Sequence, residues 1–206
     1  MSVSTPVPGQ RTGIQTSPRT CLASLNGVIY GRGTIDATYA YDGANTSHED
    51  ELRPGTIMAQ LTSGLWVPCK RTVVATGNTG TVTSVVVTDA RAFKVGDVIS
   101  IDSDTSITIT AIDYTTNTLT IASTALVDAD VVKATTPAGS DVARGILDEF
   151  IKLKDEDGVA RNKSTGRIIL AGMVYHSMLL GDATAIRAAT TMKWGQILFT
   201  DDAGQA

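Results

Sequence analysis

Long apolar runs and aromatic residues are scarce in this sequence of 206 residues. The longest apolar run, from Ile168 to Tyr175, is far shorter than the roughly 18 or more residues that a membrane-spanning helix needs. The chain starts with neither a basic segment nor an apolar stretch of secretory length, so no signal peptide is expected. We therefore expect a protein that is made in a cytoplasm and has no membrane partner.

Cysteine is equally scarce, since only Cys21 and Cys69 occur. A cytoplasmic chain of this size does not need a disulfide to hold its fold together. We predict two free, partly buried thiols, and the alternative that the two cysteines pair stays open.

Positive charge is in short supply: 17 Lys and Arg stand against 21 Asp and Glu, for a net charge of -4. A nucleic-acid binder needs clustered positive charge to displace counterions from phosphates, so no nucleic-acid partner is expected. Hydrophobic residues make up 42% of the chain and charged residues 18%, which is enough apolar material for a packed core. A globular fold follows.

Motifs that carry chemistry are missing as well. The chain has two histidines, His48 and His176, and no CxxC, HxxxH or HExxH spacing. Catalysis most often needs a histidine held by a carboxylate, and His176 is followed only by a serine on the same predicted strand, which would point the other way. The acidic turns 102–104 and 155–158 lack the third ligand and distal glutamate of a calcium loop. We predict no enzyme, no metal site and no cofactor.

The first unit that the composition does contain is residues 1–50, which are rich in Ser, Thr, Pro, Gly and Asn. Such a composition predicts an extended N-terminal arm. Its first 35 residues hold three arginines and no acid, together with short apolar groups that a solvated tail would not need. We therefore prefer an arm that becomes ordered on a partner over an idle terminus.

The second unit, residues 51–71 together with 138–206, is predicted to be a β-rich core. Strands are expected at 56–61 and 65–67 as a hairpin, at 167–175 and at 196–200. One short C-terminal helix is expected, with Asp182 as its N-cap residue. The apolar face of that helix is predicted to hold Ala185, Ile186, Ala189 and Met192.

The third unit, residues 72–137, is rich in β-branched residues and interrupts the second. Ile107, Ile109 and Ala111 alternate with threonines, and a turn is expected at 113–117 before a second alternating strand. We predict an inserted small antiparallel β-barrel or sandwich. The whole chain is thus expected to be mainly β, with an extended arm, a compact core and this insert.

Several short motifs of the core resemble a known family. The segment from Leu52 to Pro68 reads LRPGTIMAQLTSGLWVP, and Ala143 to Leu147 reads ARGIL. Together with residues 33–46 and the unit from Thr184 to Phe199, they resemble the head decoration proteins of tailed phages, the family of the phage lambda capsid-stabilising protein. The resemblance covers about two thirds of the chain, and residues 72–137 depart from it.

The resemblance implies a capsid decoration protein that stabilises the head of a bacteriophage, as a structural component of the virion. Such a protein is a homotrimer on the outer surface of the expanded capsid, at three-fold and quasi-three-fold sites. It binds the major capsid protein and resists the pressure of the packaged DNA, and its arm becomes ordered by extending a sheet. The alternative is a virion-surface adhesion or carbohydrate-binding module displayed through the insert, and a hydrolase with a poorly signalled site is a more remote one.

The apolar groups of the arm are the predicted contacts with the capsid. The large aromatic residues outside the arm are assigned to the core or to a trimer interface. The predicted capsid contacts are Val7, Ile14, Leu22, Leu25, Val28, Ile29 and Tyr30, and the predicted core or trimer residues are Trp66 and Trp194.

Overall fold

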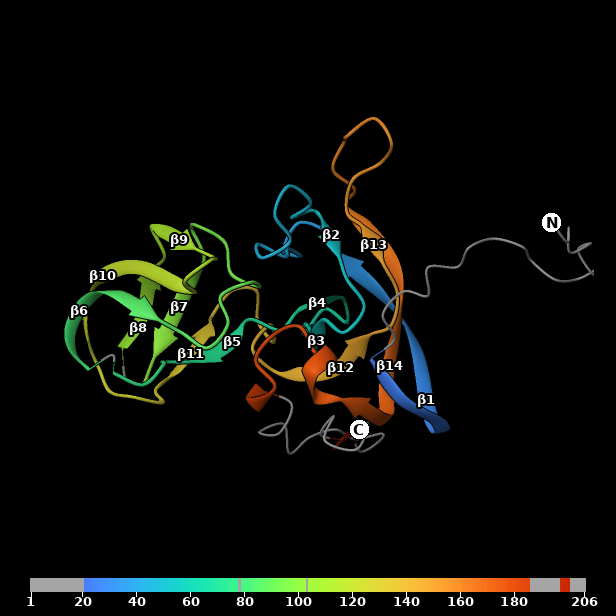
Figure 1. Cartoon of the computed structure of the whole chain (residues 1–206). Coiled ribbons are helices and arrows are strands. Elements are labelled where there is room, and N and C mark those ends of the chain that lie inside the picture. The colour runs from blue at the N-terminus through green and yellow to red at the C-terminus, as the bar shows by residue number, and fades with distance from the viewer. Residues whose placement is uncertain (1–20, 78, 103, 186–196, 201–206) are drawn as a thin grey trace, which may run out of the picture.

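The computed structural model describes residues 21–77, 79–102, 104–185 and 197–200 (Figure 1). Within them the protein is mainly β, as predicted, and the one helical element with described bounds is the 3-10 turn η1 (His176–Met178). The apolar face of the predicted C-terminal helix lies, apart from Ala185, outside the described residues. The Asp182 carboxylate, expected at the N-cap of this helix, accepts hydrogen bonds from the Thr184 amide at 2.8 Å and hydroxyl at 2.6 Å.

Five strands form a closed β-barrel, in which the first strand pairs with the last (Figure 1). The predicted hairpin is confirmed, since β3 and β4 pair antiparallel with Ala59 opposite Val67. The closing pair is antiparallel and joins the start of the described chain to a strand near its end. In spatial order the barrel strands are β1 (Leu22–Asp36), β4 (Trp66–Pro68), β3 (Ile57–Gln60), β12 (Ala143–Leu147) and β14 (Lys163–Tyr175).

Strands β3, β4 and β12 are buried on both faces, which explains why apolar residues stand at successive positions in them. Met58 belongs to one hydrophobic cluster, while its neighbours Ile57 and Ala59 belong to another. Because successive side chains of a strand point to opposite faces, each strand separates two apolar clusters. Further strands extend this part of the fold: β15 (Ile197–Thr200) runs parallel to the end of β14, and β2 (Glu51–Leu52) pairs with β13 (Ile151–Lys152).

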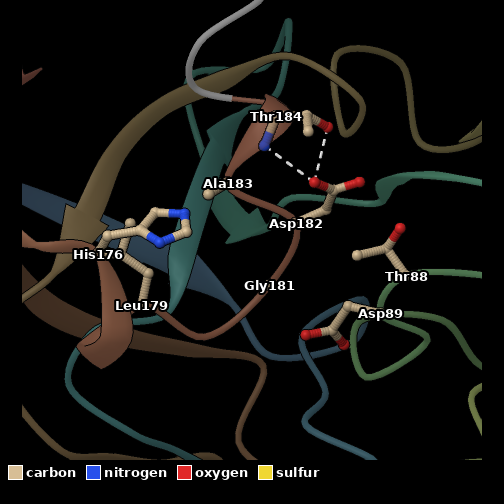
Figure 2. Close-up of a pocket in the computed structure, with 8 residues that line it drawn as sticks. All are labelled: Thr88, Asp89, His176, Leu179, Gly181, Asp182, Ala183 and Thr184. Atoms are coloured by element: carbon tan, nitrogen blue, oxygen red, sulfur yellow. Dashed lines mark hydrogen bonds between the residues drawn. The ribbon is translucent and has the colours of Figure 1, made fainter. Parts of the chain in front are cut away.

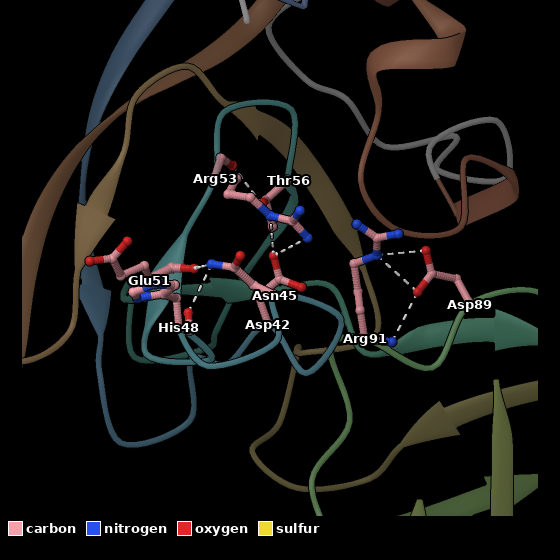
Figure 3. Close-up of polar contacts among 8 residues, drawn as sticks. All are labelled: Asp42, Asn45, His48, Glu51, Arg53, Thr56, Asp89 and Arg91. Carbon is pink, nitrogen blue, oxygen red and sulfur yellow. Dashed lines mark hydrogen bonds and ion pairs between the residues drawn. The ribbon is translucent and has the colours of Figure 1, made fainter. Parts of the chain in front are cut away.

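The structure differs from the predicted arm over residues 22–50. Residues 22–36 form β1 of the barrel, and residues 37–50 fold back onto it. In this loop the buried Asp42 carboxylate accepts a hydrogen bond from Arg53 Nε at 2.8 Å, and Asn45 Nδ2 donates to the carbonyl oxygen of His48 at 2.8 Å (Figure 3). The composition of residues 22–50 led to a wrong prediction of an extended arm, because β1 is held in the barrel by β14, which lies far along the chain. Residues 1–20 of the predicted arm lie outside the described residues.

Residues 71–134 form seven strands in two small sheets around a hydrophobic cluster of their own (Figure 1). Phe93, Ile99 and Leu119 are among its buried members. The two-sheet arrangement corresponds to the sandwich alternative for the insert, and the closed barrel lies in the other part of the chain. The strands are β5 (Arg71–Val73), β6 (Gly80–Val86), β7 (Val98–Ile101), β8 (Asp104–Thr108), β9 (Ala111–Asp113), β10 (Thr118–Leu126) and β11 (Val131–Ala134).

The two ends of the insert lie side by side, because β5 and β11 pair antiparallel with Arg71 opposite Lys133. At this base the fully buried Lys70 places its Nζ at 2.8 and 2.6 Å from the two Asp97 carboxylate oxygens. The loop 37–50 also contacts the insert, since the Gly43 amide donates to the Arg91 carbonyl at 2.9 Å. The insert is therefore attached to the barrel by noncovalent contacts as well as by the two chain connections.

Candidate interaction surface

An exposed apolar pair lies on β1. Ile29 is 48% exposed and Tyr30 is 40% exposed, although both belong to a barrel strand. The cause is an irregular register: Ser24 is opposite Met173 on β14, yet Ile29 is already opposite Ala171. Residues 25–28 therefore bulge out of the ladder, with Gly27 at a φ of 74°. The pairing then resumes at Ile29 and Tyr30, whose side chains reach the surface.

Arg167 on β14 completes this surface. Its guanidinium carbon lies 5.1 Å from the centre of the Tyr30 ring, and its Nη2 lies 2.8 Å from an Asp148 carboxylate oxygen. The Arg167 amide donates to the Glu149 carboxylate at 2.6 Å. A stacked, ion-paired guanidinium keeps a defined direction although its side chain is 52% exposed.

The charges of this surface are partly removed from water. Burial raises the pKa of Asp148 above its ordinary value, while the nearby Arg167 works in the opposite direction. The pKa of Tyr30 is also raised, first by burial and then by the Asp148 charge. The Asp148 side chain is only 4% exposed, so Arg167 presents the accessible charge of the pair.

We call Ile29, Tyr30 and Arg167 the β1 patch. Tyrosine and arginine are among the residue types enriched at the energetic centres of protein interfaces. Because Arg167 is already oriented by Tyr30 and Asp148, a partner that binds it would pay little conformational entropy. The arrangement suits recognition of another protein surface and offers no nucleophile paired with a base.

The other predicted contact residues have different locations. Leu22 is 8% exposed and belongs to the core, so it offers no free surface, and Val28 is partly buried over Gly172. Leu25 lies in the bulge, and its side chain is not described. Val7, Ile14 and Trp194 lie outside the described residues.

Trp66 lies in the core, 7% exposed, and its indole covers Gly33 of β1.

Arg167 was not predicted from the sequence, because only the pairing of β1 with β14 brings it beside Tyr30. His48 is exposed in the loop 37–50, and His176 starts the 3-10 turn η1 instead of ending a strand as expected.

The described part of the chain contains neither a cluster of metal ligands nor a membrane-spanning helix. No group of three His, Cys, Asp or Glu side chains there is placed to hold a metal ion. None of the described helices has the length and apolar content that crossing a bilayer requires. Both cysteines are free and buried.

Comparison with known proteins adds no relative, since no family model, no curated protein and no solved structure matches the chain. The class of protein is therefore given by the fold alone: a mainly β protein with a closed five-stranded barrel.

Proposed function

We propose that this protein is a decoration protein of a tailed-phage capsid, which binds the outer surface of the expanded head as a homotrimer and stabilises it. The observation that carries the proposal is the β1 patch, an exposed Ile29–Tyr30 pair beside an oriented arginine, at residues that the sequence assigned to the capsid contact. The resemblance of the segments 52–68 and 143–147 to head decoration proteins supports the choice of partner.

The physical mechanism is cross-linking of neighbouring capsid subunits. Packaged DNA pushes the subunits apart, and a trimer that holds three of them adds contacts that must break together. Linked binding sites convert weak individual contacts into a strong joint one, because the second and third contacts form within one complex. A small patch on each protomer is then enough to resist the pressure.

The partner surface is expected to provide an apolar recess for Tyr30 and a carboxylate for Arg167. Arg167 has the planar donor array that binds carboxylates in a two-pronged manner. A single exposed ion pair contributes little by itself, so the apolar contact supplies most of the affinity and the arginine fixes the orientation.

Binding to undecorated expanded heads tests the proposal directly. The purified protein is mixed with such heads and sedimented, beside the variants Tyr30→Ala and Arg167→Ala. Each variant is expected to bind about tenfold or more weakly, as truncation of a central interface residue does. Val127→Ala, at a position on the insert that is 59% exposed, is the matched control and is expected to bind like the unchanged protein.

A truncation that lacks residues 1–20 separates the N-terminal segment from the β1 patch. It leaves β1 intact, whereas removal of residues 1–50 would destroy the barrel. If both this truncation and Tyr30→Ala weaken binding, residues 1–20 and the β1 patch both take part in the contact with the capsid. Unchanged binding of both patch variants would refute the β1 patch, and failure of the unchanged protein to bind heads would refute the function.

A further inference from the structure

A pocket of about 330 Å³ lies where the insert meets the chain that follows β14 (Figure 2). Thr88 and Asp89 line it from the insert, and residues between His176 and Thr184 line it from the other side. The volume is at the lower end of the range of small-molecule sites. No residue of the β1 patch lines this pocket, so it is separate from the surface described above.

Asp182 is the polar group in this pocket whose bonding is incomplete. The residue is 5% exposed, and its Oδ1 accepts both hydrogen bonds from Thr184. Its buried Oδ2 has no hydrogen-bond partner. Figure 2 shows this second oxygen turned away from Thr184, toward the side of the pocket where Thr88 lies. A buried carboxylate oxygen without a donor has lost its hydration without gaining a partner, and a bound donor would restore that hydrogen bond.

The other carboxylate of the pocket is already neutralised. Both Asp89 oxygens lie close to Arg91 Nε, at 3.0 and 2.7 Å, and one also accepts a hydrogen bond from the Arg91 amide. The lining residues include no lysine or arginine, and Asp182 forms no ion pair with any described residue. The uncompensated negative charge of the pocket is therefore that of Asp182.

Other charged residues near Asp182 do not change the negative charge of the pocket to a positive one. Asp141 and Asp182 both raise the pKa of the buried Cys69 thiol, and Arg71 lowers it. Two of them are negative and one is positive. A ligand that carries positive charge is accordingly favoured over a neutral or an anionic one.

We propose that this pocket binds a small organic ammonium cation, whose N–H groups donate to Asp182 Oδ2. A charge-assisted hydrogen bond of this kind is about twice as strong as a neutral one. The carbon atoms of the ligand pack against Leu179 and Ala183, and the Thr88 hydroxyl lies at the opposite wall. The inference is independent of the proposed function.

Three isosteric probes distinguish the possible ligand classes by isothermal titration calorimetry on the full chain. Putrescine carries two ammonium groups, butane-1,4-diol replaces them with hydroxyl groups, and succinate replaces them with carboxylates. The proposal predicts binding of putrescine, much weaker binding of the diol and no binding of succinate. Equal binding of the diol would overturn the cationic ligand class, and no binding of putrescine would overturn the site.

The variant Asp182→Asn tests the residue, because asparagine keeps an oxygen for the Thr184 amide and removes the charge. Putrescine is expected to bind this variant at least about tenfold more weakly. Asp157→Asn, at an exposed position of the loop between β13 and β14, is the matched control for the loss of one negative charge and should bind unchanged. Unchanged binding to Asp182→Asn would overturn the proposal.

A second variant keeps the test valid if Asp182→Asn fails to fold. Thr88 is exposed on the rim, so Thr88→Arg is expected to fold and to place its own guanidinium in the pocket. This variant should lose putrescine binding. In a separate NMR titration of the unchanged protein with putrescine, the amide resonances of Gly181 and Thr184 should shift. Putrescine binding that persists in Thr88→Arg, or shifts confined to other residues, would place the cation elsewhere and overturn the proposal.

Discussion

At the scale of single residues, the structure separates apolar side chains that build the fold from those that remain available. Leu22 and Ile29 belong to the same strand and were assigned the same role from the sequence, yet one is 8% and the other 48% exposed. The bulge between them makes the difference, because it changes which side of the ladder each residue faces. The exposure of Ile29 thus depends on a register irregularity that the residue types do not encode.

The two cysteines give a prediction of pH dependence. Burial raises the pKa of the Cys21 and Cys69 thiols from 9.0 to about 12. The unfolded chain therefore loses these protons first, so the contribution of the thiols to stability is complete below pH 9 and is lost as the pH rises toward 12. Each thiol is expected to cost up to about 1.4 kcal/mol of unfolding free energy per pH unit in that window.

Urea unfolding at pH 8, 9 and 10 measures this loss. The double variant Cys21→Ala, Cys69→Ala is the control, since it keeps every other titrating group and is expected to show a shallower decline above pH 9. If the unfolding free energy fell equally steeply with pH in both proteins, the loss of stability would not come from the two thiols. In the native protein both thiols should also resist alkylation at pH 8 and react once the chain is unfolded.

At the scale of elements, local sequence patterns identified strands better than their partners. The hairpin of β3 and β4 follows from a turn between two short apolar runs, and β14 and β15 follow from apolar segments near the end of the chain. The antiparallel pairing of β1 with β14 could not be predicted, because nothing in residues 22–36 indicates a partner so far along the chain. The position of Arg167 in the β1 patch was unpredictable for the same reason.

Gly33 tests the close approach of β1 to the barrel core. A Cβ atom at this residue would lie 2.5 Å from Cδ1 of Trp66, a bulky side chain that is itself buried. Gly33→Ala is therefore expected to destabilise the protein by about 1–3 kcal/mol through overpacking. Chemical denaturation measures the change, and Thr34→Ala at the next, exposed position should have an effect of less than about 1 kcal/mol. Equal effects of the two substitutions would show that Trp66 yields easily.

At the scale of the whole molecule, two hydrophobic cores are built from different stretches of one chain. The cluster of the insert contains only residues from Val74 to Ala134, and the two barrel clusters contain none of them. The composition of residues 72–137 indicated such a unit because its β-branched alternation differs from the flanking sequence. The buried base at Lys70 and the docking of the loop 37–50 had no sequence signal, because both depend on how the two parts meet.

Removal of the insert tests whether the barrel folds without it. Deletion of residues 72–137 removes Asp97, the partner of Lys70, together with the insert surface against which the Lys70 ammonium lies, so the lysine becomes accessible to water and is kept. This variant is expected to unfold in a single cooperative transition and to bind expanded heads like the full chain.

The deletion also distinguishes the proposed function from adhesion or carbohydrate binding through the insert. A stable deletion variant that keeps its circular-dichroism β signal and binds heads agrees with the decoration function. Loss of head binding in a variant that still folds would assign the contact to the insert and contradict the β1 patch.

The antiparallel pairing of Arg71 with Lys133 fixes the entry and exit of the insert next to each other. Any foreign polypeptide whose own termini are adjacent could therefore be spliced between these two strands without stretching the host scaffold. Under the proposed decoration function, this junction would serve as a grafting point for antigens or enzymes in many copies on one particle.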